Sequence, residues 1–332
     1  MAREIAEIPG VVSHLLNRTD LFAALAERIN RAKPRIVVFC GRGSSGHVGV
    51  YLRYLFEARL GMLASAAAPS VMTVYKQVPA MHDALFVVVS QSGHSPDIVM
   101  ATQRAREVGA LTLAIVNDST SPAAAASELI LPIDAGVELS VAATKSVVLS
   151  MIAGARLVAA LAPDHDLDMA LKQLPQRLSG ALACDWSIWA DTLAESTAAF
   201  VVGRGYGLGC AREIALKICE ILRIPALGYS AAELQHGPRA SISSTTPVLA
   251  LRQNDQAART VEEFVSGLSG VGGKVFAAGG AAGTLPWIGD GHPICDPIVM
   301  LVPAYRAIES AARRRGFDPD KPPYLSKVTR TL

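Results

Sequence analysis

The chain has 332 residues, of which 51% are apolar and only 18% are charged, and its formal net charge is +2. This small charge, without any block of Lys and Arg, argues against a nucleic-acid-binding surface. The length predicts about two domains of roughly 150 residues each. The large apolar fraction predicts extensive buried cores and favours a buried contact between subunits.

The N-terminal residues mix charged and apolar side chains and lack the apolar core of a signal peptide. The longest apolar stretch, residues 147–162, is shorter than a membrane span and contains Arg156. Five scattered cysteines do not form a disulfide pattern and are interpreted as buried thiols of a reducing compartment. We therefore expect a soluble cytoplasmic protein.

The first half alternates between strand-like and helix-like segments. Its strand-like runs are apolar throughout, as in strands buried on both faces of a parallel sheet, and they cover residues 36–40, 85–90, 111–117 and 129–134. The helical patterns between them cover residues 46–60, 96–108 and 141–161. This βαβα order predicts an α/β fold with a doubly wound parallel sheet flanked by helices.

The second half repeats the alternation. Strand-like runs cover residues 198–205, 247–253 and 274–280, and helices are expected near 168–183, 186–196, 208–222, 255–269 and 297–315. The polar stretch 162–168 contains Pro163 and predicts the boundary between domains spanning 1–164 and 165–332. A GRG tripeptide follows a buried strand in both halves, at Gly41 and at Gly203, 162 residues apart. This spacing, close to half the chain, predicts a duplicated domain.

The first GRG belongs to GRGSSG, which has the Gly spacing of a dinucleotide-binding loop. That motif also needs an acidic residue at the end of the next strand, and the segment VMTVYK (71–76) ends in Lys76 instead. One alternative is a plain tight turn. The other, which we favour, is a loop whose amides bind a phosphate or substrate oxygen together with Ser44 and Ser45.

The segment VVVSQSGHSPD (87–97) raises the question of a Ser-His-Asp nucleophile site. The G-x-S-x-G pattern of a hydrolase elbow is absent. Ser95 can cap a helix, Pro96 suits its first position, and Asp97 suits its first turn. The preceding loop offers side chains for binding an anion, namely Ser90, Gln91 and Ser92. We therefore predict an anion-binding loop, with a simple capped turn as the alternative.

Three downstream segments carry possible acid–base groups. Glu213, Lys217 and Glu220 share one helix face, which is typical either of a solvated surface with a Glu–Lys pair or of a proton shuttle in a cleft. His236 precedes Gly-Pro in YSAAELQHGPRAS, and Lys327 lies in the C-terminal segment. Both also fit ordinary surface positions. The seven histidines lack zinc-binding spacing, and we expect neither a metal nor a cofactor.

Five segments together resemble one known family: SQSG-x-S, GVELSVAATK, ALKICE, AAELQHGP and the terminal LSK. They are similar to the sugar isomerase (SIS) half of glutamine–fructose-6-phosphate aminotransferase and to SIS deaminases of amino-sugar phosphates. The resemblance covers essentially the whole chain. It implies two tandem SIS domains, the first with an N-terminal helical segment and the second with a C-terminal tail, and a homodimer with a shared active site.

The resemblance also implies roles for particular residues. The sugar phosphate and nearby hydroxyls would be bound by Ser44, Ser45, Ser90, Gln91, Ser92 and Ser95, and the sugar would be lined by Val141 and Ala142. Glu220 would move a proton between C1 and C2, assisted by Lys217. His236, reached from the neighbouring subunit in relatives, would open the sugar ring. Lys327 would contact the open-chain sugar and could form an imine with a ketose.

This sequence departs from the family pattern in a few places. His94 stands where relatives usually have an acidic residue, and Ser95 replaces a Thr. The aminotransferase begins with a glutamine-hydrolysing domain whose cysteine follows the initiator Met, whereas Ala2 follows Met1 here. We therefore expect a reaction with free ammonia or water.

The expected reaction converts glucosamine 6-phosphate and water to fructose 6-phosphate and ammonia. The alternatives are another phosphosugar aldose–ketose isomerase, a galactosamine-6-phosphate deaminase, a sugar–amine deglycase, or a non-catalytic SIS protein that senses a sugar phosphate. A sensor would need the phosphate-binding serines, but would not need Glu220, His236 and Lys327. The presence of all three favours an enzyme.

Overall fold

The computed structural model describes residues 1–268, 274–280 and 283–327. The chain folds into two compact units. The GRGSSG unit contains Gly10–Glu138, Lys145–Leu171 and the described end of the chain from Ser326. The GRGYG unit contains Met1–Pro9, Leu139–Thr144 and Lys172–Leu325. Both are α/β units with parallel sheets, as the alternation of apolar runs and helical patterns predicts.

The GRGSSG unit is built on a five-stranded parallel sheet with the order β2-β1-β3-β4-β5. Its strands are β1 (Ile36–Cys40), β2 (Leu63–Ala66), β3 (Ala84–Ser90), β4 (Leu111–Val116) and β5 (Leu129–Pro132). Its helices are α2 (Thr19–Ala32), α3 (Gly43–Leu60), α4 (Pro69–Thr73), α5 (Pro96–Glu107), α6 (Pro122–Ala126) and α7 (Lys145–Leu161).

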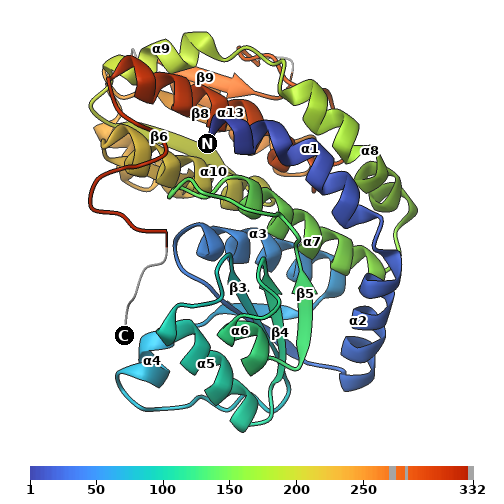
Figure 1. Ribbon diagram of the computed structural model, residues 1–332. Helices are drawn as coiled ribbons and strands as arrows, with labels where there is room; N and C mark the ends of the chain where they lie inside the picture. The colour runs from blue at the N-terminus through green and yellow to red at the C-terminus, as the bar shows by residue number, and fades with distance from the viewer. Residues whose placement is uncertain (269–273, 281–282, 328–332) are drawn as a thin grey trace. The chain divides into compact units, whose positions relative to one another are not determined.

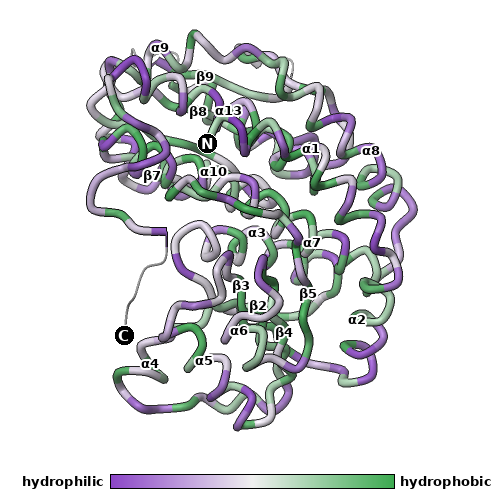
Figure 2. Tube along the Cα trace, in the orientation of Figure 1, coloured by the Kyte–Doolittle hydropathy of each residue, from purple (hydrophilic) through white to green (hydrophobic). Residues whose placement is uncertain are grey.

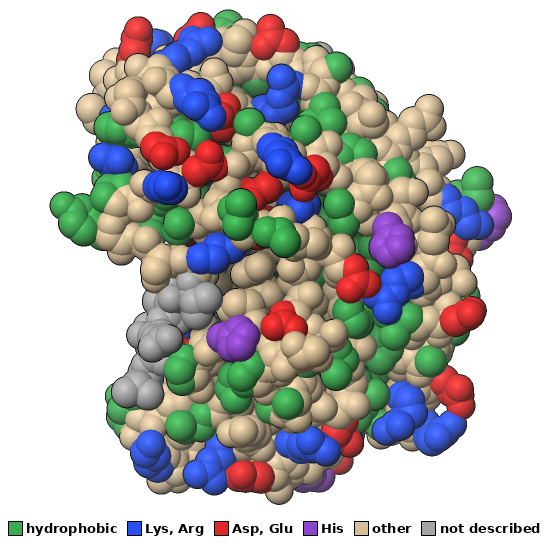
Figure 3. Space-filling view, in the orientation of Figure 1, with side chains coloured by type: hydrophobic (Ala, Val, Ile, Leu, Met, Phe, Trp, Pro, Cys, Tyr) green, Lys and Arg blue, Asp and Glu red, His purple; other side chains and the backbone are tan. Residues whose placement is uncertain are grey.

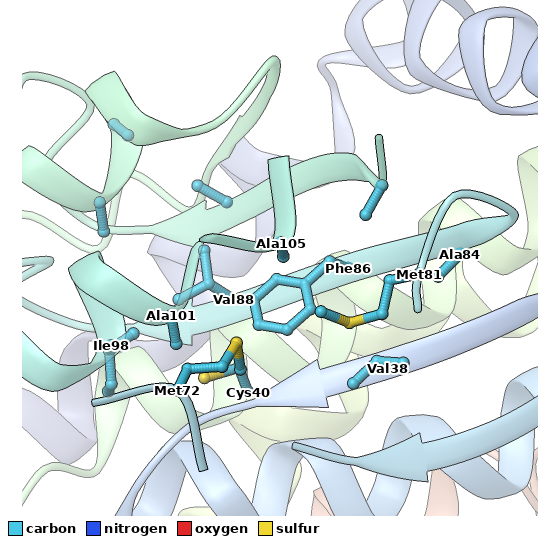
Figure 4. Packing of buried hydrophobic residues seen from close by; sticks show 14 of the residues in the cluster. Val38, Cys40, Met72, Met81, Ala84, Phe86, Val88, Ile98, Ala101 and Ala105 are labelled. Carbon is cyan, nitrogen blue, oxygen red and sulfur yellow. The ribbon is translucent and has the colours of Figure 1, made fainter. Parts of the chain in front are cut away.

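Helices cover both faces of this sheet, with α3 and α7 on one face and α4, α5 and α6 on the other (Figure 1). The strands β3, β4 and β5 are mostly hydrophobic along their length (Figure 2). On the α5 face, Phe86 and Val88 of β3 form a buried cluster with Val38 and Cys40 of β1 (Figure 4). Burial on both faces explains why these strands lack polar alternation.

The GRGYG unit has a four-stranded parallel sheet with the order β7-β6-β8-β9. Its strands are β6 (Ala199–Gly203), β7 (Ala226–Ser230), β8 (Val248–Leu251) and β9 (Val275–Ala278). Its helices are α9 (Ser187–Glu195), α10 (Gly207–Lys217), the π-helix η1 (Ile218–Leu222), α11 (Ala231–Gln235), the 3₁₀-helix η2 (Pro238–Ser241), α12 (Ala258–Leu268) and α13 (Asp296–Arg314). Two further helices, α1 (Ala2–Leu16) and α8 (His165–Ala181), contribute residues to both units.

The two sheets share one topology. In each, the first strand of the unit lies between the second and the third, and all neighbours are parallel. The register also repeats, because Cys40 pairs with Val88 in one sheet and Val202 pairs with Ala250 in the other, both 162 residues further on. The predicted duplication is therefore confirmed. The predicted domain boundary between residues 164 and 165 stays a prediction.

Several element ends differ from the prediction. The helix expected to begin at residue 46 starts at Gly43, so the two serines of GRGSSG lie in its first turn. The helix expected over 141–161 starts only at Lys145, because residues 137–144 form an irregular loop. The helix expected over 208–222 changes to a π-helix at Ile218.

None of the helices in the described ranges is long and apolar enough to cross a membrane. On the face drawn in Figure 3, acidic and basic side chains are interspersed. All five cysteines are free, and three of them, Cys40, Cys210 and Cys295, are buried as expected. Burial raises the pKa of Cys40 and of Cys295 to about 12, so both are neutral thiols at physiological pH.

Candidate active site

The loop after β1 places two predicted phosphate ligands at the start of a helix. Ser44 and Ser45, both partly exposed, lie in the first turn of α3, where backbone N–H groups have no partner within the helix. A Cβ on Gly41 would come within 2.8 Å of the Ser45 backbone carbon. Glycine is therefore required for the close approach of the strand end to the helix start.

The loop after β3 is a tight turn held by its own serines. The buried Ser90 hydroxyl accepts a hydrogen bond from the Gly93 amide over 3.0 Å, and the Ser92 hydroxyl accepts one from the His94 amide over 3.3 Å. Gly93 has a φ of +68°, and a Cβ there would lie 2.1 Å from the Ser121 hydroxyl. Both serine hydroxyls retain a proton to donate to an anion.

The start of α5 differs in part from the prediction. Ser95 stands at the N-cap and Pro96 at the first helical position, but the Ser95 side chain makes no capping hydrogen bond. Asp97 is fully buried, and its Oδ2 accepts hydrogen bonds from Nε and Nη2 of Arg42 at 3.0 and 2.9 Å. This ion pair joins the β1 and β3 loops. Sequence reasoning missed it because its partners lie 55 residues apart.

His94, which departs from the family pattern, has an acidic neighbour on the next loop. Its Nε2 lies 3.7 Å from Oδ2 of Asp118, and both side chains are about half exposed. Hydrogen bonds from Thr120, followed by the proximity of His94, hold the pKa of Asp118 below its usual value. The carboxylate is therefore ionised at neutral pH and orients the imidazole at the edge of the β3 loop.

The equivalent loops in the GRGYG unit are built differently. Gln253 takes the place of Gln91, 162 residues later, but is only 1% exposed, whereas Gln91 is partly exposed. Its Nε2 donates to the Arg204 carbonyl over 2.7 Å and to Asp255 over 3.0 Å. The serines of GRGSSG and SQSGHS have no counterparts in GRGYG and RQNDQA. The candidate anion-binding loops therefore belong to the first copy of the repeat.

The strongest acid–base candidates form a buried cluster at the end of α10. Lys217 makes an ion pair with Glu220, three residues further on, and its Nζ lies 3.5 Å from Oε1 of Glu213. Glu213 and Lys217 are fully buried, whereas the Glu220 side chain is 23% exposed. Tyr305 of α13 donates a hydrogen bond to Glu213 over 3.4 Å. The solvated-face alternative is therefore wrong for Glu213 and Lys217.

The π-helix explains how Glu220 becomes accessible. It begins at Ile218, one residue after Lys217, and changes the direction of side chains relative to a continuing α-helix. Ile218, Ile221 and Leu222 remain buried, so the apolar side of the segment stays in the core. Glu220 is left partly exposed with an ammonium against it, which suits a carboxylate that exchanges protons with a substrate.

His236 belongs to the same unit and lies at its surface. It is exposed at the C-terminal end of α11, and its backbone N–H donates to the Glu233 carbonyl. Its imidazole makes no hydrogen bond or ion pair with the residues that the structure describes. Gly237 follows with a φ of +138° and ends the helix, as Gly-Pro predicts.

Lys327 has an acidic partner in the GRGSSG unit. Its Nζ donates a hydrogen bond to Oε2 of Glu138 over 3.0 Å. Glu138 is buried, and it also accepts hydrogen bonds from the N–H and hydroxyl of Ser146 in the first turn of α7. The C-terminal lysine is therefore attached to the loop 137–144, and sequence reasoning did not identify Glu138 as its partner.

The predicted sugar-lining residues lie in this loop. Val141 is partly exposed and Ala142 is buried, so of the two only the Val141 side chain is open to a ligand. The loop carries exposed apolar side chains on either side of Glu138, at Val137 and Leu139. The predicted site residues are thus divided between the two units. The GRGSSG unit contains the serine loops and Lys327, and the GRGYG unit contains Glu220, Lys217, His236, Val141 and Ala142.

A cavity of about 530 Å³ in the GRGYG unit lies elsewhere. Its walls come from the first residues of α1, the turn between α8 and α9, and α13, and none of the predicted site residues lines it. Within the ranges that the structure describes, no group of three His, Cys, Asp or Glu side chains could hold a metal ion. The size of a cavity therefore does not identify the candidate site in this protein. The chemistry of the side chains does.

Comparisons with known proteins agree with the fold. Glutamine–fructose-6-phosphate aminotransferase (isomerizing) of Pseudomonas aeruginosa is 32% identical, and that of Methanothermobacter thermautotrophicus is also 32% identical. Each match covers 98% of this chain, which spans only 58% and 56% of the length of these relatives.

Solved structures extend the likeness over the whole fold. A protein of Silicibacter pomeroyi DSS-3, assigned as a phosphosugar isomerase, has a TM-score of 0.91 and 39% identity over 96% of this chain and 98% of its own. Glucosamine-6-phosphate deaminase of Thermotoga maritima has a TM-score of 0.78 and 21% identity over 97% of this chain and 99% of its own. The SIS domain family matches at residues 29–160 and 192–277, and the chain therefore belongs to the SIS domain family.

Proposed function

We propose that this protein is a cofactor-independent amino-sugar-phosphate deaminase that converts glucosamine 6-phosphate and water to fructose 6-phosphate and ammonia. The observation that carries the proposal is the pairing of a partly exposed carboxylate, Glu220, with the buried ammonium of Lys217. A reaction that moves a proton between adjacent carbons needs a single base within reach of both. It also needs a positive charge near the oxygen or nitrogen on which negative charge develops.

The chemistry begins with the open-chain aldehyde. Glu220 removes the C2 proton, whose acidity comes from the neighbouring carbonyl group. The electron pair forms the C1–C2 double bond of an enolamine, while the π electrons of the C1 carbonyl move to its oxygen, which takes up a proton from solvent. Glu220 then returns the proton to C1, and the nitrogen lone pair forms the C2–N double bond of an imine as the nitrogen releases a proton to solvent. Water adds to that imine carbon and ammonia departs, giving the ketose. Atoms balance without an oxidant or reductant, because the sugar is oxidised at C2 and reduced at C1.

The other groups have supporting roles in the proposal. His236 opens the sugar ring, and its exposed position suits a group that serves the site of a neighbouring subunit in a homodimer. Ser44, Ser45, Ser90, Gln91, Ser92 and Ser95 bind the phosphate. Lys327 contacts the open-chain sugar. Binding energy from the phosphate, remote from the reacting carbons, then orients C1 and C2 against Glu220.

Similarity to the aminotransferases supports an amino-sugar substrate, because their names specify fructose 6-phosphate and an amino transfer. The likeness to the Silicibacter pomeroyi protein supports phosphosugar isomerisation more generally. Both reactions need proton transfer between C1 and C2, so the same Glu220–Lys217 pair serves either one. We further propose a cytoplasmic location.

The test is a substrate panel with the purified full chain. We expect ammonia and fructose 6-phosphate from glucosamine 6-phosphate without an added cofactor. Turnover of another amino-sugar phosphate, a sugar–amine adduct or a plain ketose phosphate in its place would change the substrate and keep the proton-transfer mechanism. Tight binding of sugar phosphates without any turnover would overturn the enzyme and leave a sensor.

A further inference from the structure

Two carboxylates in the GRGYG unit hold the loop that contains the predicted sugar-lining residues. Oε1 of Glu4 accepts hydrogen bonds from the backbone N–H groups of Leu139 and Ser140, at 2.5 and 3.1 Å. Oδ1 of Asp320 accepts a hydrogen bond from the Ser140 hydroxyl over 2.7 Å. The backbone carbonyl of Asp320 accepts one from the Val141 N–H over 3.2 Å. Three consecutive amides of an irregular loop therefore have acceptors from distant parts of the chain.

These acceptors come from segments that the sequence separates widely. Glu4 lies in the first turn of α1 and Asp320 follows α13, and the start of α1 can be found at the N label of Figure 1. Asp320 also accepts the Met1 amino group, which lies 3.4 Å from Oε2 of Glu4. The bonds from Glu4 to the loop do not involve that amino group.

The charge state of both carboxylates favours these contacts. Burial opposes ionisation of Glu4, but hydrogen bonds from Ser140 and Leu139 outweigh it and hold its pKa below the usual value. For Asp320, burial is likewise outweighed by hydrogen bonds from the amino terminus and Ser140, and its pKa is lowered too. Both groups are therefore ionised at neutral pH, and bonds from N–H and O–H donors to a carboxylate are stronger than those to neutral acceptors.

We propose that Glu4 and Asp320 are positioning residues that fix the loop Leu139–Thr144 in the conformation that receives the sugar. The inference rests on the proposed function and on the expectation from the family resemblance that Val141 and Ala142 line the sugar. The Glu4 carboxylate accepts from two backbone amides directly before Val141, and the Asp320 carboxylate accepts from the Ser140 hydroxyl in the same stretch. Replacing either carboxylate makes the loop more mobile. Part of the free energy of substrate binding is then used to order the loop, which weakens binding.

The kinetic test compares Glu4→Gln and Asp320→Asn with the wild type. We expect each variant to raise KM about tenfold while kcat changes by less than about threefold, because a binding surface used equally in ground and transition states affects KM alone. Glu7→Gln is the matched control, because Glu7 lies on the same helix and accepts a hydrogen bond from Arg3 at the surface. It should keep wild-type kinetics.

A double-variant comparison separates positioning from general damage. Ser140→Ala removes the hydroxyl that donates to Asp320 and that also contacts Glu4, and it leaves the Ser140 backbone N–H in place. If the contact acts as described, Ser140→Ala combined with Asp320→Asn raises KM less than the product of the two single effects. Wild-type KM in folded Glu4→Gln and Asp320→Asn, or a fall in kcat alone, would overturn the proposal.

Hydrogen exchange tests the loop independently of catalysis. The amides of Leu139 and Ser140 should be protected in the wild type and should exchange at least about tenfold faster in Glu4→Gln, with no change in Glu7→Gln. If the wild type neither turns over nor binds any sugar phosphate, the proposed function fails while faster exchange still supports the loop contact. Unchanged exchange in a folded Glu4→Gln variant contradicts the contact, whatever the substrate.

Discussion

Lys327 donates a hydrogen bond to Glu138 over 3.0 Å, although the two residues lie 189 positions apart in the chain. The Glu138 side chain is fully buried, whereas that of Lys327 is 24% exposed. Because Glu138 also binds the first turn of α7 through Ser146, it fixes the lysine relative to a rigid helix. The hydrogen bond thereby holds the flexible Lys327 side chain in one place, as its proposed contact with the open-chain sugar requires.

Replacing Glu138 by Gln should therefore lower kcat/KM for the amino-sugar phosphate by about 10- to 100-fold. A hydrogen bond between charged groups contributes about 1.5–3 kcal/mol, and each 1.4 kcal/mol corresponds to about a factor of ten. Steady-state kinetics measure the change. Glu128→Gln is the control, since Glu128 is exposed in the same unit. Equal kinetics for Glu138→Gln and wild type would show that Lys327 needs no partner.

Glu220→Gln should reduce kcat by about 10²- to 10⁴-fold, the usual contribution of a general base, and should leave sugar-phosphate binding within about threefold. The amide keeps the size of the side chain and can still accept a hydrogen bond from Lys217, so the fold is preserved. Calorimetric titration and single-turnover assays measure binding and chemistry separately. Near-normal turnover in this variant would remove Glu220 from the role of base.

Gly93→Ala should destabilise the protein more than Gly136→Ala. Both glycines have a positive φ, +68° and +69°, so both substitutions cost about 1–2 kcal/mol of backbone strain. The Gly93 Cβ also collides with a neighbour, the Ser121 hydroxyl, whereas no atom of the residues that the structure describes lies within 4 Å of a Cβ at Gly136. Urea unfolding measures the difference in the free energy of unfolding. Equal losses would show that the β3 loop is looser than its contacts indicate.

The stability difference between wild type and Glu4→Gln should depend on pH. The usual pKa of Glu4 is 4.5, and the folded protein lowers it. A carboxyl whose pKa is lowered by folding stabilises the protein fully above its unfolded pKa, and this contribution is lost as the pH falls through the folded value. The wild type should therefore exceed Glu4→Gln in unfolding free energy at pH 7.

The two proteins should approach each other below pH 4.5, where Glu4 becomes protonated in both the unfolded and the folded state. Chemical denaturation across this pH range provides the measurement. A stability difference that stays constant, or that grows on acidification, would contradict the ionised contact between Glu4 and the loop.

The central strands could be predicted from the sequence because burial on both faces leaves an unbroken apolar run. The edge strands β5 and β9 are also apolar runs and could be predicted, but β2 and β7 could not be, since their sequences, LASA and ALGYS, consist largely of small or polar residues. Each lies at the outer edge of its sheet, where only one neighbour pairs with it. Their existence follows from the topology of the repeat rather than from local propensity.

In the candidate site, likewise, some contacts could be predicted from the sequence and others could not. The Lys217–Glu220 pair could be inferred from helical spacing, because both residues belong to one short segment. The hydrogen-bond partners of Glu138, Arg42 and Glu4 lie 55 to 189 residues away in the sequence. Local spacing contains no information on such contacts, and the deep burial of Lys217 could not be told from a solvated helix face either.

Turnover of glucosamine 6-phosphate in deuterated water tests whether Glu220 moves the proton between C2 and C1. We expect equal amounts of fructose 6-phosphate and ammonia, with partial deuterium at C1, because a fraction of the protons that Glu220 removes from C2 exchanges with solvent before being returned. Both the products and the exchange should disappear in Glu220→Gln. A folded protein that binds amino-sugar or ketose phosphates, but gives neither products nor C1/C2 exchange with any of them, would rule out the proposed proton transfer.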